Sequence, residues 1–231
     1  MRKPTASVLA TVLGLIGILV LDGCGSGADG PGGLPAGGVI AVIGDSYMSG
    51  YGMPTPDKGM ASLMADHLGM KLDNFAVGTT GYVSKGPSAD DHSYPVQAKA
   101  AIAAHADLYI VEGGLNDWAL VYKDKTLDLD ALRQAVHSLY QRLIAAEGAD
   151  NVIVVGPVWP YDIDAPGISE VNDLLKSEAA AAGLGFVDPF GEEWITPENN
   201  DQYIGPDLAH PNELGQVYLG RKLADAIDAL R

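Results

Sequence analysis

Short aliphatic runs alternate with amphipathic segments along most of the chain, and this alternation restricts the fold more than any other feature. The runs are 39–43, 71–76, 107–112, 151–155 and 185–188, and the helical segments are 60–68, 96–105, 128–147, 168–182 and 212–230. Aliphatic runs of this length, separated by helices, are typical of parallel strands that are buried on both faces. The sequence therefore predicts one α/β domain with a five-stranded parallel sheet.

The segment before the first strand is typical of an exported protein. Residues 8–21 are largely apolar and follow two basic residues, a pattern too short for a comfortable membrane span but suited to a signal peptide. The sequence "LDGC", 21–24, resembles the bacterial lipobox, although Asp22 stands where lipoproteins usually carry a small or hydroxylated residue. This resemblance implies that 1–24 are a signal peptide, that Cys24 is lipidated and that the protein lies on the outer face of a bacterial cell membrane. Cleavage by ordinary signal peptidase, with release into the cell envelope or medium, and an uncleaved anchor are the alternatives.

Residues 25–38, "GSGADGPGGLPAGG", have the composition of a flexible tether. The folded domain is therefore expected to span 39–231. Cys24 is the only cysteine, so no disulfide can form within that domain.

The charge balance and the absent motifs exclude several functions. The chain has 30 acidic against 14 basic residues, and its net charge of −16 argues against a nucleic-acid partner. No P-loop, dinucleotide-binding glycine motif or zinc-protease motif is present, and no cofactor or metal is predicted. His92 lies beside Asp90 and Asp91, but one histidine and two acids in a loop favour a solvated loop over a metal site. The G-x-S-x-G elbow of α/β-hydrolases is also missing.

Polar motifs lie at the carboxyl ends of three predicted strands and just before the last helix. The sequence "GDS", 44–46, follows the first strand, "NFAVGTTGY", 74–82, overlaps the second, "GGLND", 113–117, follows the third, and "DLAHPN", 207–212, precedes the last helix. Ligands of parallel α/β sheets bind beyond the carboxyl ends of the strands. We therefore expect these motifs to meet at one edge of the sheet.

The residue types in these motifs are those that acyl transfer requires. Ser46 needs a base to become a nucleophile, and His210 can serve if Asp207, three residues earlier, orients its ring. The developing oxyanion needs donors, which the backbone N–H of Ser46, an N–H within the turn 77–79 and the side chain of Asn116 can supply.

The four motifs, in this order, resemble those of the SGNH (GDSL-type) hydrolases. The resemblance covers 44–215 and implies a three-layer α/β/α, flavodoxin-like fold, a Ser46–His210–Asp207 triad and ester hydrolysis without a cofactor. It also implies an oxyanion hole from Ser46, the second motif and Asn116. The family glycine of the second motif falls on Thr79, with Gly78 one position earlier, so the assignment of that donor stays open between the two.

Each motif alone is weak, because a serine after a strand is often only a helix N-cap. Their combined order favours a serine esterase that hydrolyses short-chain acyl or lipid esters through an acyl-enzyme. One alternative is an O-acetyl esterase acting on cell-envelope glycans, and another is a catalytically inactive protein of the same fold that binds a glycan or a lipid. The expected partners are thus a small-molecule, lipid or glycan ester and, through an N-terminal lipid, a membrane.

Two acidic residues and five aromatic residues near the strand ends also allow predictions. Asp45 and Asp117 match family positions and are expected to brace their turns rather than to react. Five aromatic residues fall near strand ends, where lining a pocket and packing in the core are equally compatible with the sequence; they are Tyr47, Tyr51, Tyr82, Trp118 and Trp159.

Overall fold

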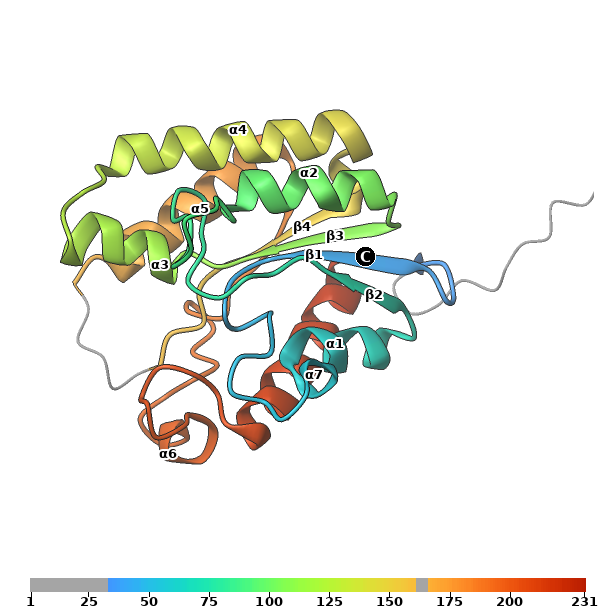
Figure 1. Cartoon of the computed structure of the whole chain (residues 1–231). Helices are drawn as coiled ribbons and strands as arrows, with labels where there is room; N and C mark the ends of the chain where they lie inside the picture. Colours follow the sequence, from blue (N-terminus) through green and yellow to red (C-terminus); the bar gives the residue numbers. More distant parts are fainter. Residues whose placement is uncertain (1–32, 161–165) are drawn as a thin grey trace, which may run out of the picture.

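A single parallel sheet forms the centre of the protein. The structure is a computed structural model, and it describes residues 33–160 and 166–231. Within these residues the sheet has five strands in the order β2-β1-β3-β4-β5, all paired in parallel (Figure 1). The strands are β1 Val39–Ile43, β2 Lys71–Asn74, β3 Leu108–Glu112, β4 Val152–Val155 and β5 Gly185–Val187. The predicted parallel sheet is confirmed.

Helices cover both faces of the sheet, which gives the predicted three-layer α/β/α architecture. One layer holds α1 (Met60–Leu68) and α7 (Glu213–Leu230), and the other holds α2 (Tyr94–Ala104), α4 (Leu129–Glu147) and α5 (Ile168–Ala182), as Figure 1 shows. Strand side chains alternate between the layers: Ile40 and Val42 pack towards α1 and α7, whereas Ala41 and Ile43 face the other layer.

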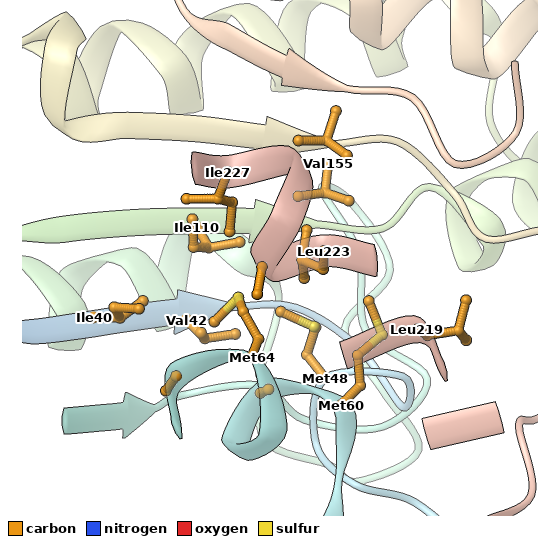
Figure 2. Packing of buried hydrophobic residues seen from close by; sticks show 14 of the residues in the cluster. Ile40, Val42, Met48, Met60, Met64, Ile110, Val155, Leu219, Leu223 and Ile227 are labelled. Carbon is orange, nitrogen blue, oxygen red and sulfur yellow. The ribbon is translucent and has the colours of Figure 1, made fainter. Parts of the chain in front are cut away.

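The layer of α1 and α7 is packed closely enough to fix the end of the chain against the start of the domain. In Figure 2, Met60 and Met64 of α1 lie near Leu219 and Leu223 of α7 over the sheet. Gly220 is required here, because a Cβ at that position would lie 2.9 Å from the Leu63 Cβ. This packing sets the position of the α7 N-terminus.

A buried hydrogen bond adds to this packing near the start of both helices. The Gln216 side chain of α7 accepts a hydrogen bond of 2.6 Å from the backbone N–H of Met60. Asn212 caps α7 as expected, since its side chain accepts from the Gly215 N–H. The loop just before α7, which carries His210, is thereby held at a defined place beside the sheet.

Several short elements were not predicted from the sequence. They are α3 Leu115–Trp118, the π-helical segment η3 Ala119–Lys123, α6 Asn200–Tyr203, and the 3-10 turns η2 Pro56–Lys58 and η4 Ala149–Asn151. Elements of three to five residues are too short to show a hydrophobic period. The second strand also ends at Asn74 instead of 76, where the Asn74 amide donates to the Met48 carbonyl and its oxygen accepts from the Ala76 N–H.

The end of the predicted tether differs from the expectation, because part of it packs on the domain. Leu34 is fully buried in the core below the sheet, and the Gly37 N–H donates to the Gly69 carbonyl. Leu34 is the one large apolar side chain in a segment of glycine, proline and small residues, so its burial is favourable. Residues 1–32, with the predicted signal peptide and Cys24, lie outside the described residues. In the described ranges, no helix has the length and hydropathy to cross a membrane.

Candidate active site

The four polar motifs converge at the carboxyl edge of the sheet. Ser46 follows β1, Thr79 follows β2 and Asn116 lies in α3 just after β3, while His210 precedes α7. All four line one cavity of about 290 Å³. Residues from four distant parts of the sequence therefore meet at one edge of the sheet, as predicted.

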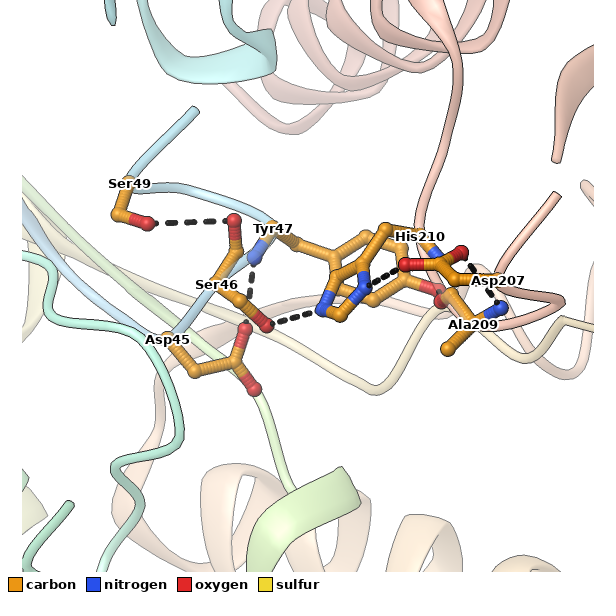
Figure 3. A network of polar contacts seen from close by, with 7 residues as sticks. All are labelled: Asp45, Ser46, Tyr47, Ser49, Asp207, Ala209 and His210. Atoms are coloured by element: carbon orange, nitrogen blue, oxygen red, sulfur yellow. Dashed lines mark hydrogen bonds and ion pairs between the residues drawn. The ribbon is translucent and has the colours of Figure 1, made fainter. Parts of the chain in front are cut away.

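A chain of two hydrogen bonds joins the serine to the aspartate through the histidine. The Ser46 Oγ lies 2.9 Å from the His210 Nε2, and the His210 Nδ1 lies 2.8 Å from an Asp207 carboxylate oxygen (Figure 3). A carboxylate can only accept, so Nδ1 carries the proton and Nε2 of the neutral ring accepts from the Ser46 hydroxyl. This tautomer is the one in which an imidazole can take a proton from serine.

The loop that carries His210 is folded around the Asp207 carboxylate. One Asp207 oxygen accepts the backbone N–H groups of Ala209 and His210, at 3.1 and 3.0 Å, while the other faces the imidazole. Burial acts to raise the pKa of Asp207, but the hydrogen bonds from His210 and Ala209 outweigh it and the pKa is lowered. Asp207 is therefore an anion that both shapes the turn and fixes the ring.

The turn that carries Ser46 is braced by two buried polar side chains. Gln97 of α2 accepts from the Gly44 N–H at 2.9 Å and donates to the Gly44 carbonyl at 3.1 Å. Asp45 accepts from the Tyr47 N–H at 2.9 Å, which confirms the bracing role expected for it. Gln97 was missed from the sequence, where its only signal is an amide in an alanine-rich helix.

The backbone N–H groups of Ser46 and of the turn after β2 are the candidates for the predicted oxyanion hole. The N–H groups of Ser46, Gly78 and Thr79 have no hydrogen-bond acceptor within the described part of the chain. Thr79 lines the cavity and has a φ of +63°, the left-handed conformation that glycine adopts readily and a β-branched residue rarely does. A Cβ at Gly78 would lie 3.8 Å from that of Ser46, so both positions lie near the serine and the second donor stays a prediction open between them.

Asn116 is positioned at the same cavity, but its amide is already engaged. Its Nδ2 donates to Asp45 at 3.1 Å and to the Thr80 carbonyl at 2.9 Å. The bond to Asp45 is the longer of the two. An oxyanion at Ser46 would therefore have to compete with Asp45 for that hydrogen.

These contacts allow the donors to be tested separately. We expect Asn116→Ala to lower kcat about 10²- to 10³-fold, as loss of one oxyanion donor does. Thr79→Gly should leave kcat almost unchanged, since the N–H remains. The free energy of unfolding should not fall, because relief of left-handed strain, about 1–2 kcal/mol, offsets the added flexibility of glycine. Steady-state kinetics and urea denaturation measure both; a large loss of kcat in Thr79→Gly would show that its side chain, not its backbone, is needed.

Asp117 holds the loop that follows β2 by accepting hydrogen bonds from its backbone. Its buried carboxylate accepts the backbone N–H groups of Tyr82, Val83 and Ser84, at 2.8, 2.9 and 3.1 Å. The expected bracing role of Asp117 is thus confirmed, and the residue connects α3 to the loop that carries Thr79.

Buried acids lie directly under the serine turn. Burial raises the pKa of Asp45 to about 7, with repulsion from Asp117 adding to it and hydrogen bonds from Tyr47 and Asn116 opposing it. Burial and then repulsion from Asp45 raise the pKa of Glu112, and a weaker contact with the Asp45 backbone N–H opposes them. The folded protein therefore favours protonated forms of this pair.

The raised pKa values of Asp45 and Glu112 predict that the folded protein loses stability as pH rises. A carboxyl with a raised pKa keeps its proton in the folded state and loses it in the unfolded state, so stability falls between about pH 4 and pH 7 by up to roughly 1.4 kcal/mol per pH unit for each proton. We expect the free energy of unfolding to drop from pH 5 to pH 8, and Glu112→Gln to reduce that drop. Urea denaturation at each pH measures it. A wild-type profile that is flat or rises over this range would contradict the prediction.

Aromatic side chains form much of the cavity wall. Trp118 and Trp159 meet edge to face at 5.6 Å, and with Leu115 and Ala119 they line the cavity next to Ser46. A second cavity, of about 370 Å³, lies beside His210 and is lined by Tyr51 and Met53. Tyr82 is buried instead, with its hydroxyl 3.0 Å from that of Tyr140. In residues 33–160 and 166–231, no three His, Cys, Asp or Glu side chains are grouped as a metal would require.

The fold and the site together define a class of protein: a three-layer α/β protein with a serine, a histidine and an aspartate in hydrogen-bonded sequence at the carboxyl edge of its sheet, as in serine hydrolases. A family model, the GDSL-like Lipase/Acylhydrolase family, matches residues 42–217. The chain belongs to this family and is a hydrolase of the esterase and lipase class.

Similar proteins agree with this membership. A GDSL lipase of Mycobacterium tuberculosis is 31% identical over 201 residues, which cover 81% of this chain and 80% of that protein. The lipase/acylhydrolase of Enterococcus faecalis has the same fold, with a TM-score of 0.65 and 18% identity over 83% of this chain and 95% of that one. The esterase EstA of Pseudoalteromonas sp., solved with monoethylphosphonate as inhibitor, gives a TM-score of 0.63 at 14% identity, over 83% and 97%. At these identities the two structures bear on the fold alone.

Proposed function

We propose that the protein is a serine esterase that hydrolyses short-chain acyl esters through an acyl-enzyme. The Ser46 Oγ attacks the ester carbonyl carbon as its proton passes to the His210 Nε2. The tetrahedral intermediate collapses, the carbon–oxygen bond to the alcohol breaks, and His210 returns the proton to the alcohol oxygen. Water, deprotonated by the same imidazole, then attacks the acyl-enzyme, and the carboxylic acid leaves as Ser46 regains its proton.

One observation carries this proposal: the hydrogen-bond sequence from Ser46 through His210 to Asp207, at 2.9 and 2.8 Å. Each role follows from it. Ser46 is 8% exposed and lines the cavity, so a substrate can reach its hydroxyl. Asp207, with its lowered pKa, stabilises the imidazolium that forms when the serine proton is transferred.

The cavity walls support an acyl group longer than acetyl. Leu115, Trp118, Ala119 and Trp159 offer apolar surface beside the serine, and the cavity of about 290 Å³ is far larger than one methyl group needs. Burying one methylene contributes about 0.8 kcal/mol, which is roughly a fourfold gain in kcat/KM if it is realised in the transition state.

A series of p-nitrophenyl esters tests the proposal. We expect kcat/KM to rise from acetate to esters of four to six carbons. The substitution Ala119→Trp, which would narrow the cavity, should remove this gain while preserving hydrolysis of the acetate. The highest kcat/KM on acetate, together with rapid deacetylation of an acetylated polysaccharide, would instead make the protein an O-acetyl esterase.

Covalent labelling separates the esterase from a binding protein that only shares the fold. A fluorophosphonate should modify Ser46 in the wild type, as shown by mass spectrometry of the labelled peptide. It should not modify Ser46→Ala. Absence of labelling and of hydrolysis in the wild type would support the inactive binding protein.

We further propose that the protein is exported and attached to the outer face of the cell membrane through lipidated Cys24, with 25–32 as part of the tether. The "LDGC" motif and the apolar stretch before it support this. Val39 begins β1 at the end of the strand opposite Ser46, so the described chain enters the sheet at the end away from the active-site cavity. Membrane fractionation of wild type and Cys24→Ser tests it: the wild type should sediment with membranes and the variant should not, and equal partitioning would refute lipidation.

A further inference from the structure

Tyr47, the residue after the serine, connects the serine turn to the histidine loop. Its hydroxyl donates a hydrogen bond of 2.6 Å to the carbonyl of Ala209, the residue before His210. The Tyr47 ring is 1% exposed and its centre lies 5.9 Å from that of the His210 imidazole. Figure 3 shows the Tyr47 side chain running past the imidazole towards Ala209.

This bond has no substitute in the described parts of the chain. Two hydrogen bonds join the serine turn, 44–51, to the histidine loop, 205–212: the one from Ser46 to His210 and the one from Tyr47 to Ala209. The first must break and reform during each turnover, because the serine proton moves to the imidazole and a new bond forms at the serine oxygen. The second takes no part in the chemistry and can persist throughout.

The other contacts of each segment hold it internally or to different parts of the fold. The serine turn is bonded to Gln97 and Asn116 on the side of α2 and α3, whereas the histidine loop is closed by Asp207 and by the bond from the Gly205 N–H to the His210 carbonyl. Each segment is thus held by its own set of hydrogen bonds, and the separation of the two segments depends on the few contacts between them.

Tyr51 also touches the imidazole but cannot set this separation. Its ring centre lies 4.3 Å from that of His210, yet the side chain is 54% exposed and its hydroxyl makes no hydrogen bond to the described residues. A ring that covers the imidazole limits its tilt, while a short, partly buried hydrogen bond such as that of Tyr47 fixes a distance.

We propose that Tyr47 is a positioning residue that keeps the His210 Nε2 within bonding distance of the Ser46 Oγ by holding the Ala209 carbonyl. This inference rests on the proposed esterase function. A displacement of about 1 Å between reacting groups can cost roughly 10²-fold in rate, so the loss of the hydroxyl that holds the Ala209 carbonyl should act on kcat.

Kinetics of Tyr47→Phe test the proposal on p-nitrophenyl butyrate. We expect kcat to fall about 10- to 100-fold while KM changes by less than about twofold, because substrate contacts remain and only the alignment of the base is lost. Tyr140→Phe is the matched control, since Tyr140 is equally buried and its hydroxyl also makes one hydrogen bond, to Tyr82. The two variants should lose similar thermal stability, but Tyr140→Phe should keep the wild-type kcat. A wild-type kcat in Tyr47→Phe, or equal losses in both variants, overturns the proposal.

Nuclear magnetic resonance of ¹⁵N-histidine-labelled protein gives a second readout that needs no turnover. The His210 Nε2 signal reports the bond to Ser46, and Ser46→Ala identifies the shift that appears when this bond is missing. We expect the Tyr47→Phe signal to move towards that of Ser46→Ala and the Tyr140→Phe signal to stay at the wild-type position. An unmoved signal in Tyr47→Phe refutes the positioning role. If the wild type hydrolyses no ester, the proposed function fails while this measurement still decides whether Tyr47 positions the imidazole.

Discussion

Replacing Ser46 with alanine is expected to lower kcat roughly 10⁴- to 10⁶-fold, a loss that no other substitution should exceed. The hydroxyl that would form the acyl-enzyme is 2.9 Å from the only histidine that lines its cavity. Without the Ser46 hydroxyl, only the hydrogen-bond donors around the cavity remain to assist attack of water on the ester. The loss should be measured with p-nitrophenyl butyrate under conditions that exclude trace wild-type enzyme.

Parallel variants separate this chemical effect from a structural one. His210→Ala should be as inactive as Ser46→Ala, because serine and base act as a unit, and Asp207→Ala should lose less. Ser46→Ala should unfold within about 1 kcal/mol of the wild type, since one hydroxyl and one hydrogen bond are removed. Full turnover by Ser46→Ala would refute the assignment of the nucleophile.

The largest expected effect on stability comes from Asp117→Ala. This substitution would leave the buried backbone N–H of Tyr82 and the partly buried N–H groups of Val83 and Ser84 without their acceptor. Each unsatisfied donor costs about 1–3 kcal/mol before the loop relaxes, so we expect a loss of about 3–5 kcal/mol in the free energy of unfolding, measured by urea denaturation. Activity should fall as well, because the loop from Thr79 to Ser84 loses its support.

Two further variants make this prediction specific. Asp73→Ala removes a solvent-exposed carboxylate and should change the free energy of unfolding by less than about 0.5 kcal/mol. Asp117→Asn keeps one oxygen acceptor and should fall between wild type and alanine. A loss below about 1 kcal/mol in Asp117→Ala would show that the loop finds other partners.

The order of the sheet explains why these residues meet. β1 lies between β2 and β3, so the segments that follow these three strands are neighbours at one edge, with Ser46 in the middle, Thr79 on one side and Asn116 on the other. His210 reaches the same edge because the packing of α7 on α1 brings the loop before α7 there.

Sequence periodicity predicted the long elements well and the short ones poorly. The helix at Leu129–Glu147 has apolar residues at three- and four-residue spacing along its whole length. The predicted helix began one residue earlier, at Asp128, which is its N-cap. The helical segment around Asn116 was missed, because α3 and the π-helical turn after it are each only a few residues long, and α3 is held by the contact of its Asp117 with the distant Tyr82 N–H. Leu34 was assigned to the tether because its neighbours are glycine and proline, although it packs in the core.

The chain by itself determined the layer architecture and the candidate reactive residues, since both depend on local patterns: alternating strand and helix runs, and side-chain types at their ends. Only the tertiary structure decided which groups touch. It placed Thr79 rather than Gly78 in the cavity wall, engaged both hydrogens of Asn116, buried Glu112 close to Asp45 and connected Tyr47 to Ala209. These are contacts between segments far apart in sequence, and their distances depend on how the layers pack, which no local pattern contains.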